Sequence, residues 1–92
     1  MKNYLKIAKK SFAITQDHLD DLKCNDDRLK KLKKDEGYNV FFKLYDDDDT
    51  LYYSGYLHED EEDEFAPLDW AMADSGCTDI KYRGKDGKFE IL

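Results

Sequence analysis

The fold is decided by residues 38–57, which read YNVFFKLYDDDDTLYYSGYL. Every second residue from Tyr38 to Leu44 is apolar or aromatic, and this period is typical of a β-strand. Four aspartates follow and predict a turn, after which residues 51–57 form the return strand of a hairpin. Because aromatic side chains fall on both faces of the hairpin, we expect one face in the core and the other partly exposed.

The sequence after the hairpin predicts a helix and two more strands. Residues 65–74 have the apolar spacing of a short helix, with Pro67 suited to its start and Gly76 to its end. Residues 78–82 alternate as a third strand, and residues 89–91 form a fourth strand after a turn bounded by glycines. We therefore expect an α+β protein with a small antiparallel sheet of about four strands in the order ββ(α)ββ.

The first 37 residues predict a basic, mainly helical region. Residues 1–14 favour a short helix followed by a short strand near residues 11–15. Residues 17–35 predict a longer helix, because leucines recur near one stripe and Asp17 suits its N-cap. The pair Asn25-Asp26 interrupts that stripe, so a break in this helix stays open.

The charge is divided unevenly along a chain of 92 residues, which is long enough for a single domain only. Residues 1–37 hold ten Lys or Arg and seven Asp or Glu, a balance of +3, whereas residues 38–92 hold five and fifteen, a balance of −10. An acidic body of this kind is repelled by nucleic acid and anionic membranes and attracted to basic protein surfaces. We expect a binding protein that holds neither free DNA nor a membrane.

Two acidic runs are the first candidates for contact with a partner. One fills the hairpin turn and the other follows the return strand, and both could copy the phosphate spacing of nucleic acid. For each run the alternative is a solvated loop. The acidic candidates are Asp46, Asp47, Asp48, Asp49, Glu59, Asp60, Glu61, Glu62, Asp63 and Glu64.

Aromatic and basic side chains supply the other candidates. Tyr52, Tyr56 and Trp70 are expected to contact a protein partner, because Tyr and Trp are enriched at interfaces. For Trp70 the alternative is a lid over the sheet edge. For the tyrosines the alternative is stacking on nucleic-acid bases, which the negative field of the protein disfavours. The lysines near the end of the predicted helix complement its dipole and are also candidates for contacts with an RNA backbone: Lys30, Lys31, Lys33 and Lys34.

Catalytic and metal chemistry has little support in the sequence. His18 and His58 lie beside acids, and no hydrolase, phosphate-loop or dinucleotide motif occurs. The four consecutive aspartates lack the glycine and the closing glutamate of a calcium loop. Cys24 and Cys77 lie 53 residues apart, which favours two reduced thiols over a disulfide. We expect no enzyme, no cofactor and no metal site.

Four pieces of the chain resemble a group of small phage and prophage proteins. They are residues 42–48 (FKLYDDD), 51–55 (LYYSG), 65–69 (FAPLD) and 76–82 (GCTDIKY), so the resemblance lies mainly in residues 41–92. As a type, the chain resembles an anti-CRISPR protein: tiny, acidic and without a catalytic motif. The resemblance implies a phage-encoded inhibitor that binds a guide-RNA surveillance complex stoichiometrically.

The resemblance and the charge together lead to one functional hypothesis. The chain would act in the host cytoplasm, bind a host CRISPR–Cas ribonucleoprotein of type I, and block target DNA by occupying a basic channel. The alternative is a small acidic immunity or accessory protein that binds one basic protein partner.

Overall fold

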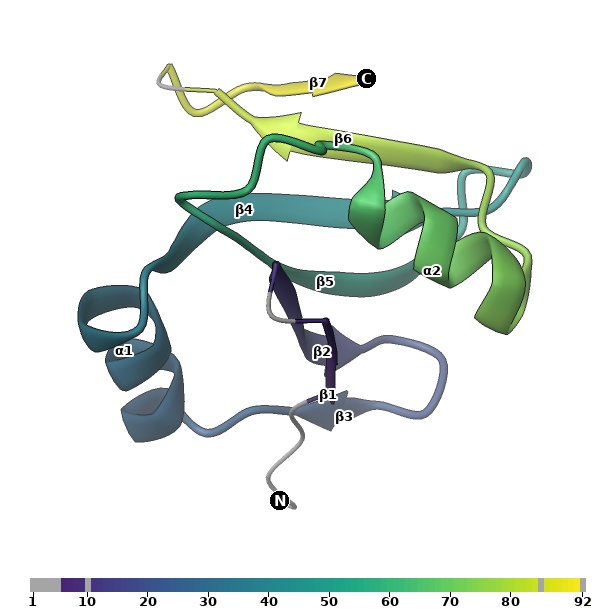
Figure 1. Ribbon diagram of the computed structural model, residues 1–92. Helices are drawn as coiled ribbons and strands as arrows, with labels where there is room; N and C mark the ends of the chain where they lie inside the picture. Colours follow the sequence, from purple (N-terminus) through teal and green to yellow (C-terminus); the bar gives the residue numbers. More distant parts are fainter. Residues whose placement is uncertain (1–5, 10, 85, 92) are drawn as a thin grey trace.

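The computed structural model describes residues 6–9, 11–84 and 86–91 (Figure 1). The elements are β1 (Lys6–Lys9), β2 (Phe12–Asp17), β3 (Leu22–Lys23), α1 (Asp26–Asp35), β4 (Tyr38–Tyr45), β5 (Leu51–His58), α2 (Ala66–Ser75), β6 (Asp79–Arg83) and β7 (Phe89–Ile91). The predicted hairpin is β4–β5, and the predicted helix is α2, which Gly76 closes in a left-handed conformation. The expected order ββ(α)ββ is therefore confirmed for the second half of the chain.

All strands belong to one open antiparallel sheet. Six of the described strands lie side by side in the order β1-β2-β5-β4-β6-β7, and the two-residue β3 pairs with β2. The expected total of about four strands is wrong, because β2 pairs with β5 from Phe12 opposite Leu57 to Asp17 opposite Tyr53. The basic N-terminal region and the acidic body thus share one sheet.

The expectation of a mainly helical N-terminal region is also wrong. Residues 6–9 form β1, and the part of the expected helix within residues 1–5 lies outside the described residues. The expected short strand near residues 11–15 is confirmed as β2. Phe12, Ala13, Ile14 and Thr15 are all buried, and a strand buried on both faces lacks the clear alternation that identifies a half-buried one.

Asp17 does not cap a helix but closes a turn between β2 and β3. Its Oδ1 accepts hydrogen bonds from the N–H groups of Leu19 (2.9 Å) and Asp20 (3.2 Å). Asp21 then adopts a positive φ of 54°, which is incompatible with a right-handed helix. The side chain that suits an N-cap suits this kind of turn for the same reason, since it accepts hydrogen bonds from the following N–H groups.

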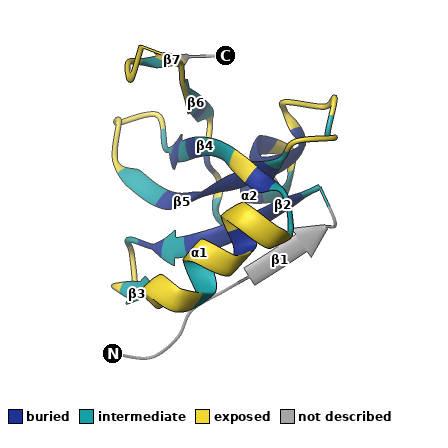
Figure 2. Ribbon diagram, turned by 90° about the vertical axis from the view of Figure 1, so that its left-hand side faces the viewer, coloured by how far each residue is buried: buried dark blue, intermediate teal, exposed yellow. Residues whose placement is uncertain are grey.

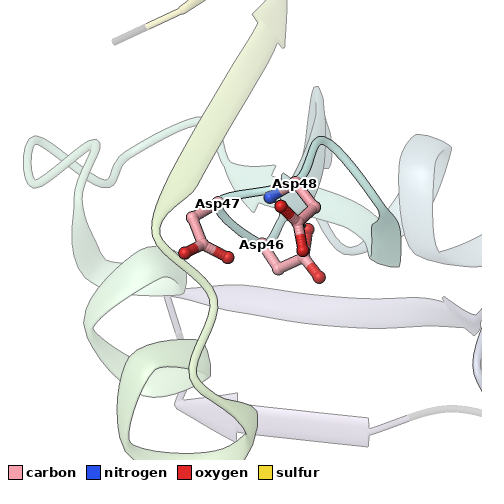
Figure 3. Close-up of side chains that lie close together, drawn as sticks. All are labelled: Asp46, Asp47 and Asp48. Carbon is pink, nitrogen blue, oxygen red and sulfur yellow. The ribbon is translucent and has the colours of Figure 1, made fainter.

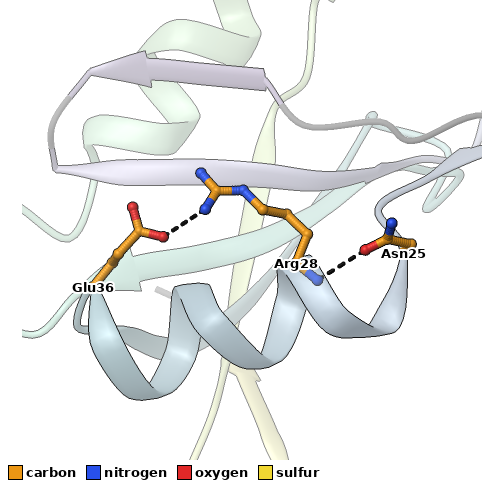
Figure 4. A network of polar contacts seen from close by, with 3 residues as sticks. All are labelled: Asn25, Arg28 and Glu36. Atoms are coloured by element: carbon orange, nitrogen blue, oxygen red, sulfur yellow. Dashed lines mark hydrogen bonds and ion pairs between the residues drawn. The ribbon is translucent and has the colours of Figure 1, made fainter.

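Helix α1 begins where the leucine stripe is interrupted. Asn25 is its N-cap and accepts a hydrogen bond from the N–H of Arg28 at 2.8 Å. The guanidinium of Arg28 reaches Glu36 beyond the other end of the helix, with 2.7 Å between Nη1 and Oε2 (Figure 4). The expected helix over residues 17–35 is therefore wrong in its first part: the helix begins at Asn25-Asp26, where the sequence leaves a break open, and Asn25 supplies the cap that Asp17 was expected to supply.

The two helices cover opposite faces of the sheet. Phe12 and Ile14 of β2 point to the larger core, which α2 covers, whereas Ala13 points to a smaller core beneath Leu32 of α1. In Figure 2, α1 lies in front of the lower part of the sheet while β6 and β7 rise above it. Most of the outer surface of α1 is exposed, and the sheet face over β4, β6 and β7 extends beyond this helix.

Candidate functional site

The β4–β5 turn holds three carboxylates close together. The ligand atoms of Asp46, Asp47 and Asp48 lie within 4.8 Å of one another (Figure 3). Oδ1 of Asp46 accepts hydrogen bonds from the N–H groups of Asp48 and Thr50, each at 2.9 Å. The hydrogen bond from Thr50 is the main cause that lowers the pKa of Asp46 from its usual value. Asp46 therefore holds the turn together and stays ionised, while Asp47 and Asp48 are exposed.

Neighbouring segments bring further aspartates to this end of the sheet. The N–H of His18 donates to the carbonyl of Tyr52 at 2.8 Å, which places the β2–β3 turn beside the hairpin. The N–H of Thr78 donates to the carbonyl of Tyr45 at 2.9 Å, which places the α2–β6 connection on the other side. These segments meet at the right-hand side of Figure 1. We call the resulting surface the aspartate end; it comprises Asp20, Asp21, Asp46, Asp47, Asp48, Asp49, Asp74 and Asp79.

The second acidic run lies at the opposite end of β5. The strand has eight residues, so about 25 Å separates the two runs. The N–H of Glu59 donates to the carbonyl of Gly37 at 2.8 Å, and the amide of Asn39 donates to the Glu59 carboxylate at 2.9 Å. The structure therefore places the runs on two separate surfaces and anchors the start of the second run beside the end of α1.

A hollow of about 190 Å³ lies under this second run. The hydroxyl of Tyr82 donates to the carbonyl of Glu64 at 2.8 Å, and burial together with the nearby carboxylates of Glu64, Asp63 and Glu61 raises the pKa of Tyr82. The floor is apolar and the rim is acidic. The residues that line the hollow are Val40, Leu57, His58, Glu59, Glu61, Glu64 and Tyr82.

The three candidate aromatic residues lie in different places. Tyr52 is at the aspartate end, where a hydrogen bond to the Asp46 carboxylate raises its pKa. Tyr56 is buried, 7% exposed, in the smaller core. Trp70 is half-buried on α2, and its ring packs on Tyr53 with 5.2 Å between the centroids. Tyr52 contacts the aspartate end directly, and Trp70 packs on Tyr53, whose hydroxyl donates to Asp74 of that surface.

The candidate lysines all lie on α1. Lys30, Lys31 and Lys34 are exposed, and Lys33 is exposed with its ammonium 5.2 Å from the centroid of the Tyr56 ring. Leu32, between them in sequence, is fully buried against the sheet. The lysines therefore form a basic outer surface on the helix, and Lys33 connects it with the sheet.

Sequence reasoning missed a basic surface on the sheet itself. Lys43 of β4 lies directly opposite Lys81 of β6, and Arg83 lies opposite Phe89 of β7. We call this surface the cationic strip; it comprises Phe41, Lys43, Tyr45, Lys81, Arg83 and Phe89. The alternation of rings and cations within β4 is visible in the sequence, but its continuation across β6 and β7 depends on which strands are neighbours.

A serine–histidine pair lies close to this strip. Nε2 of His18 is 2.7 Å from Oγ of Ser54, and burial is the main cause that lowers the pKa of His18, followed by the charge of Lys43. Ser54 is only 3% exposed, and its carbonyl accepts a hydrogen bond from the Thr15 hydroxyl at 3.4 Å. The pair therefore joins the β2–β3 turn to β5.

The two cysteines are also enclosed. Cys24 and Cys77 are free and buried, and burial raises the pKa of both thiols. A raised thiol pKa lowers the fraction of the reactive thiolate at neutral pH. Neither residue therefore has the environment of a nucleophile.

Two further findings bear on function. Within the described ranges, no helix combines the length and the apolar character that crossing a membrane requires. Comparison with protein-family models, curated proteins and solved structures produced no match.

Proposed function

We propose that this chain is a phage-encoded, non-enzymatic inhibitor of a host CRISPR–Cas surveillance complex of type I. It would bind a basic nucleic-acid channel in a protein subunit and so block target DNA. The observation that carries the proposal is the aspartate end, where two turns, the end of α2 and the start of β6 bring eight carboxylates to one end of the sheet. The resemblance of residues 41–92 to anti-CRISPR proteins supports the choice of partner.

The aspartate end has the properties of a surface that competes with nucleic acid. Asp47, Asp48 and Asp49 are exposed on a turn that Asp46 holds in shape. Fixed anionic groups on a protein with a net charge of −7 attract a basic channel at long range and accelerate association. The partner's Lys and Arg side chains, which otherwise bind phosphates, would bind these carboxylates.

The hollow under the second acidic run adds a specific contact. Its apolar floor suits the aliphatic part of a Lys or Arg side chain, and its glutamates suit the charged end. Such a pocket would hold one basic side chain of the partner, about 25 Å from the aspartate end. Two separated contacts of this kind would fix the orientation of the inhibitor on its partner.

The hollow also favours a second candidate function. A small immunity or accessory protein that binds one basic protein would use the same pocket and the same aspartate end. The two candidates differ in the size and composition of the partner.

A titration of a purified type I complex tests the proposal. Target DNA binding should fall linearly with added protein and saturate near a small whole-number ratio, because the inhibitor acts by occupancy. The variant Asp47→Asn/Asp48→Asn/Asp49→Asn should inhibit less than the control variant Asp26→Asn/Asp27→Asn/Glu90→Gln, which removes the same number of charges elsewhere. Inhibition far below one molecule per complex would refute inhibition by occupancy. Capture of a single basic protein in place of the ribonucleoprotein would favour the accessory protein.

A further inference from the structure

We propose that the cationic strip binds single-stranded nucleic acid. The inference is independent of the proposed function, because it concerns side chains of the opposite charge and a different ligand, although the strip meets the aspartate end where Tyr45 lies opposite Asp79. It rests on the contacts between rings and cations in the strip, on cations that form no ion pair with a carboxylate of the described residues, and on a hollow beside them.

Each cation of the strip lies over one of its rings. The guanidinium of Arg83 lies 4.9 Å from the centroid of Phe41, and the ammonium of Lys43 lies 4.4 Å from the centroid of Phe89. The rings of Phe41 and Phe89 are themselves 5.8 Å apart. At the other end, the ammonium of Lys81 lies 4.6 Å from the Tyr45 ring.

The strip continues from the sheet towards α1. The rings of Phe41 and Tyr56 lie 5.0 Å apart, and the ammonium of Lys33 lies over the Tyr56 ring. Contacts therefore lead from Lys33 through the rings of Tyr56 and Phe41 to Phe89, and the cations of Arg83 and Lys43 lie over two of these rings. Only the tertiary structure joins these residues, which come from α1, β4, β5, β6 and β7.

The positive charges of the strip destabilise the folded protein. Lys43 and Lys81 face each other across β4 and β6, and like charges directly opposite on a sheet are destabilising. The chain has 22 acidic residues, yet no carboxylate of the described residues lies within 4.0 Å of the ammonium or guanidinium groups of Lys43, Lys81 and Arg83. Cations that no carboxylate in the described part of the chain neutralises are complementary to an external anion.

The aromatic rings of the strip favour one class of anion over others. Single-stranded nucleic acid offers phosphates to the cations and unstacked bases to aromatic rings and to the guanidinium plane. A hollow of about 160 Å³ lies between α1 and the sheet and has Phe41 and Tyr56 in its wall, so an unstacked base has a place to enter beside the strip. A duplex keeps its bases stacked inside, and an acidic peptide has no planar groups that require these rings.

The net charge sets the strength of this binding. At about 0.15 M salt the screening length is about 8 Å, so the aspartate end opposes the strip only over a short distance. The expectation that the chain holds no free DNA follows from net charge alone. The strip predicts weak and local binding of single strands, while a duplex, with more phosphates and no exposed bases, remains excluded.

Fluorescence anisotropy of labelled oligonucleotides tests the inference with the intact chain. Short oligouridylate and oligothymidylate should both bind, and their relative affinity shows whether RNA or DNA is preferred. The variant Lys43→Gln/Lys81→Gln should lower the affinity about tenfold at about 0.15 M salt, because each phosphate contact with a single strand contributes about 0.7 to the salt slope. The slope itself should fall by about 1.4.

Matched variants separate the strip from charge in general. Lys30→Gln/Lys31→Gln removes the same charge from the outer surface of α1 and should change the affinity much less. Phe89→Leu keeps an apolar side chain but removes the ring, and should weaken binding at least about fivefold if bases stack there. Circular dichroism and thermal melting confirm that each variant is folded.

Several results would overturn the inference. The first is that neither oligonucleotide binds, and the second is that a duplex binds as well as a single strand. Equal losses in the two lysine pairs would mean that only total charge matters. Equal binding of a polyglutamate peptide, with no effect of Phe89→Leu, would assign the strip to an acidic protein segment.

Discussion

Replacing Gly55 by alanine should separate the N-terminal strands from the rest of the sheet. Gly55 lies in β5 opposite Ile14 of β2, where the register of the two strands shifts. A Cβ at this position would lie 2.2 Å from the carbonyl oxygen of Ala13 and 2.9 Å from Cζ of Phe42. The first atom belongs to the backbone, so rotation of a side chain cannot relieve the clash.

The size of the effect follows from what must move. Overpacking in a core costs about 1–3 kcal/mol. The methyl group added by Gly55→Ala would push β2 away from β5, and β2 carries Phe12 and Ile14, which are fully buried. We therefore expect a loss near the upper limit, about 3 kcal/mol. Gly87→Ala is the control, because Gly87 has a φ of 82° with no atom within 4 Å, so its cost is only the backbone strain of about 1 kcal/mol.

Equilibrium unfolding in urea measures both variants. With a slope of about 1 kcal/mol per molar urea for a small domain, the midpoint should fall by about 3 M for Gly55→Ala and by about 1 M for Gly87→Ala. If Gly55→Ala destabilises the protein no more than the control, the backbone of β2 does not lie as close to β5 as the structure has it. The position of β2 inside the sheet would then be refuted as well.

Three further predictions concern charged groups. Asp47→Asn/Asp48→Asn/Asp49→Asn should slow association with the ribonucleoprotein and flatten its salt dependence in surface plasmon resonance, because interfacial charges act mainly on the association rate; an unchanged rate at low salt would make the turn a solvated loop. Substitution of Glu for the α1 lysines (Lys30, Lys31, Lys33 and Lys34) should weaken binding to the assembled ribonucleoprotein but not to an isolated protein subunit, and equal losses would exclude an RNA contact. Asp46 has a pKa below its usual 3.8 in the folded state, so its stabilising effect is present above the unfolded pKa and is lost as pH falls through the folded pKa. Asp46→Asn keeps an acceptor oxygen for Thr50 and should flatten the acid-unfolding curve below about pH 4, whereas a curve identical to that of the parent would contradict the role of Asp46.

The sequence by itself determined the elements whose signals are local. The β4–β5 hairpin follows from alternation on either side of four aspartates, and α2 ends at Gly76 because glycine adopts the left-handed conformation there. The uneven charge follows from counting residues. Each of these features depends on residues that are close together in the chain.

The tertiary structure alone decided the N-terminal half. Asp17 and Asn25 have side chains that suit an N-cap, and both accept hydrogen bonds from nearby N–H groups, but only Asn25 begins a helix. The difference arises because Phe12 and Ile14 of β2 are buried in the core that α2 covers, and β2 pairs with β5. The free energy of this burial outweighs the local helix preference of the sequence.

For the candidate surfaces too, the sequence shows the residues and the tertiary structure shows which of them are neighbours. The acidic runs are readable in the sequence, but their position at opposite ends of β5, and the addition of Asp74 and Asp79 to one of them, follow from the sheet topology. The cationic strip could not be predicted, because Lys43 and Lys81 are 38 residues apart in the chain and become neighbours only when β6 pairs with β4. Local periodicity shows which face of a strand a side chain occupies, but hydrogen bonding between distant strands decides which side chains share that face.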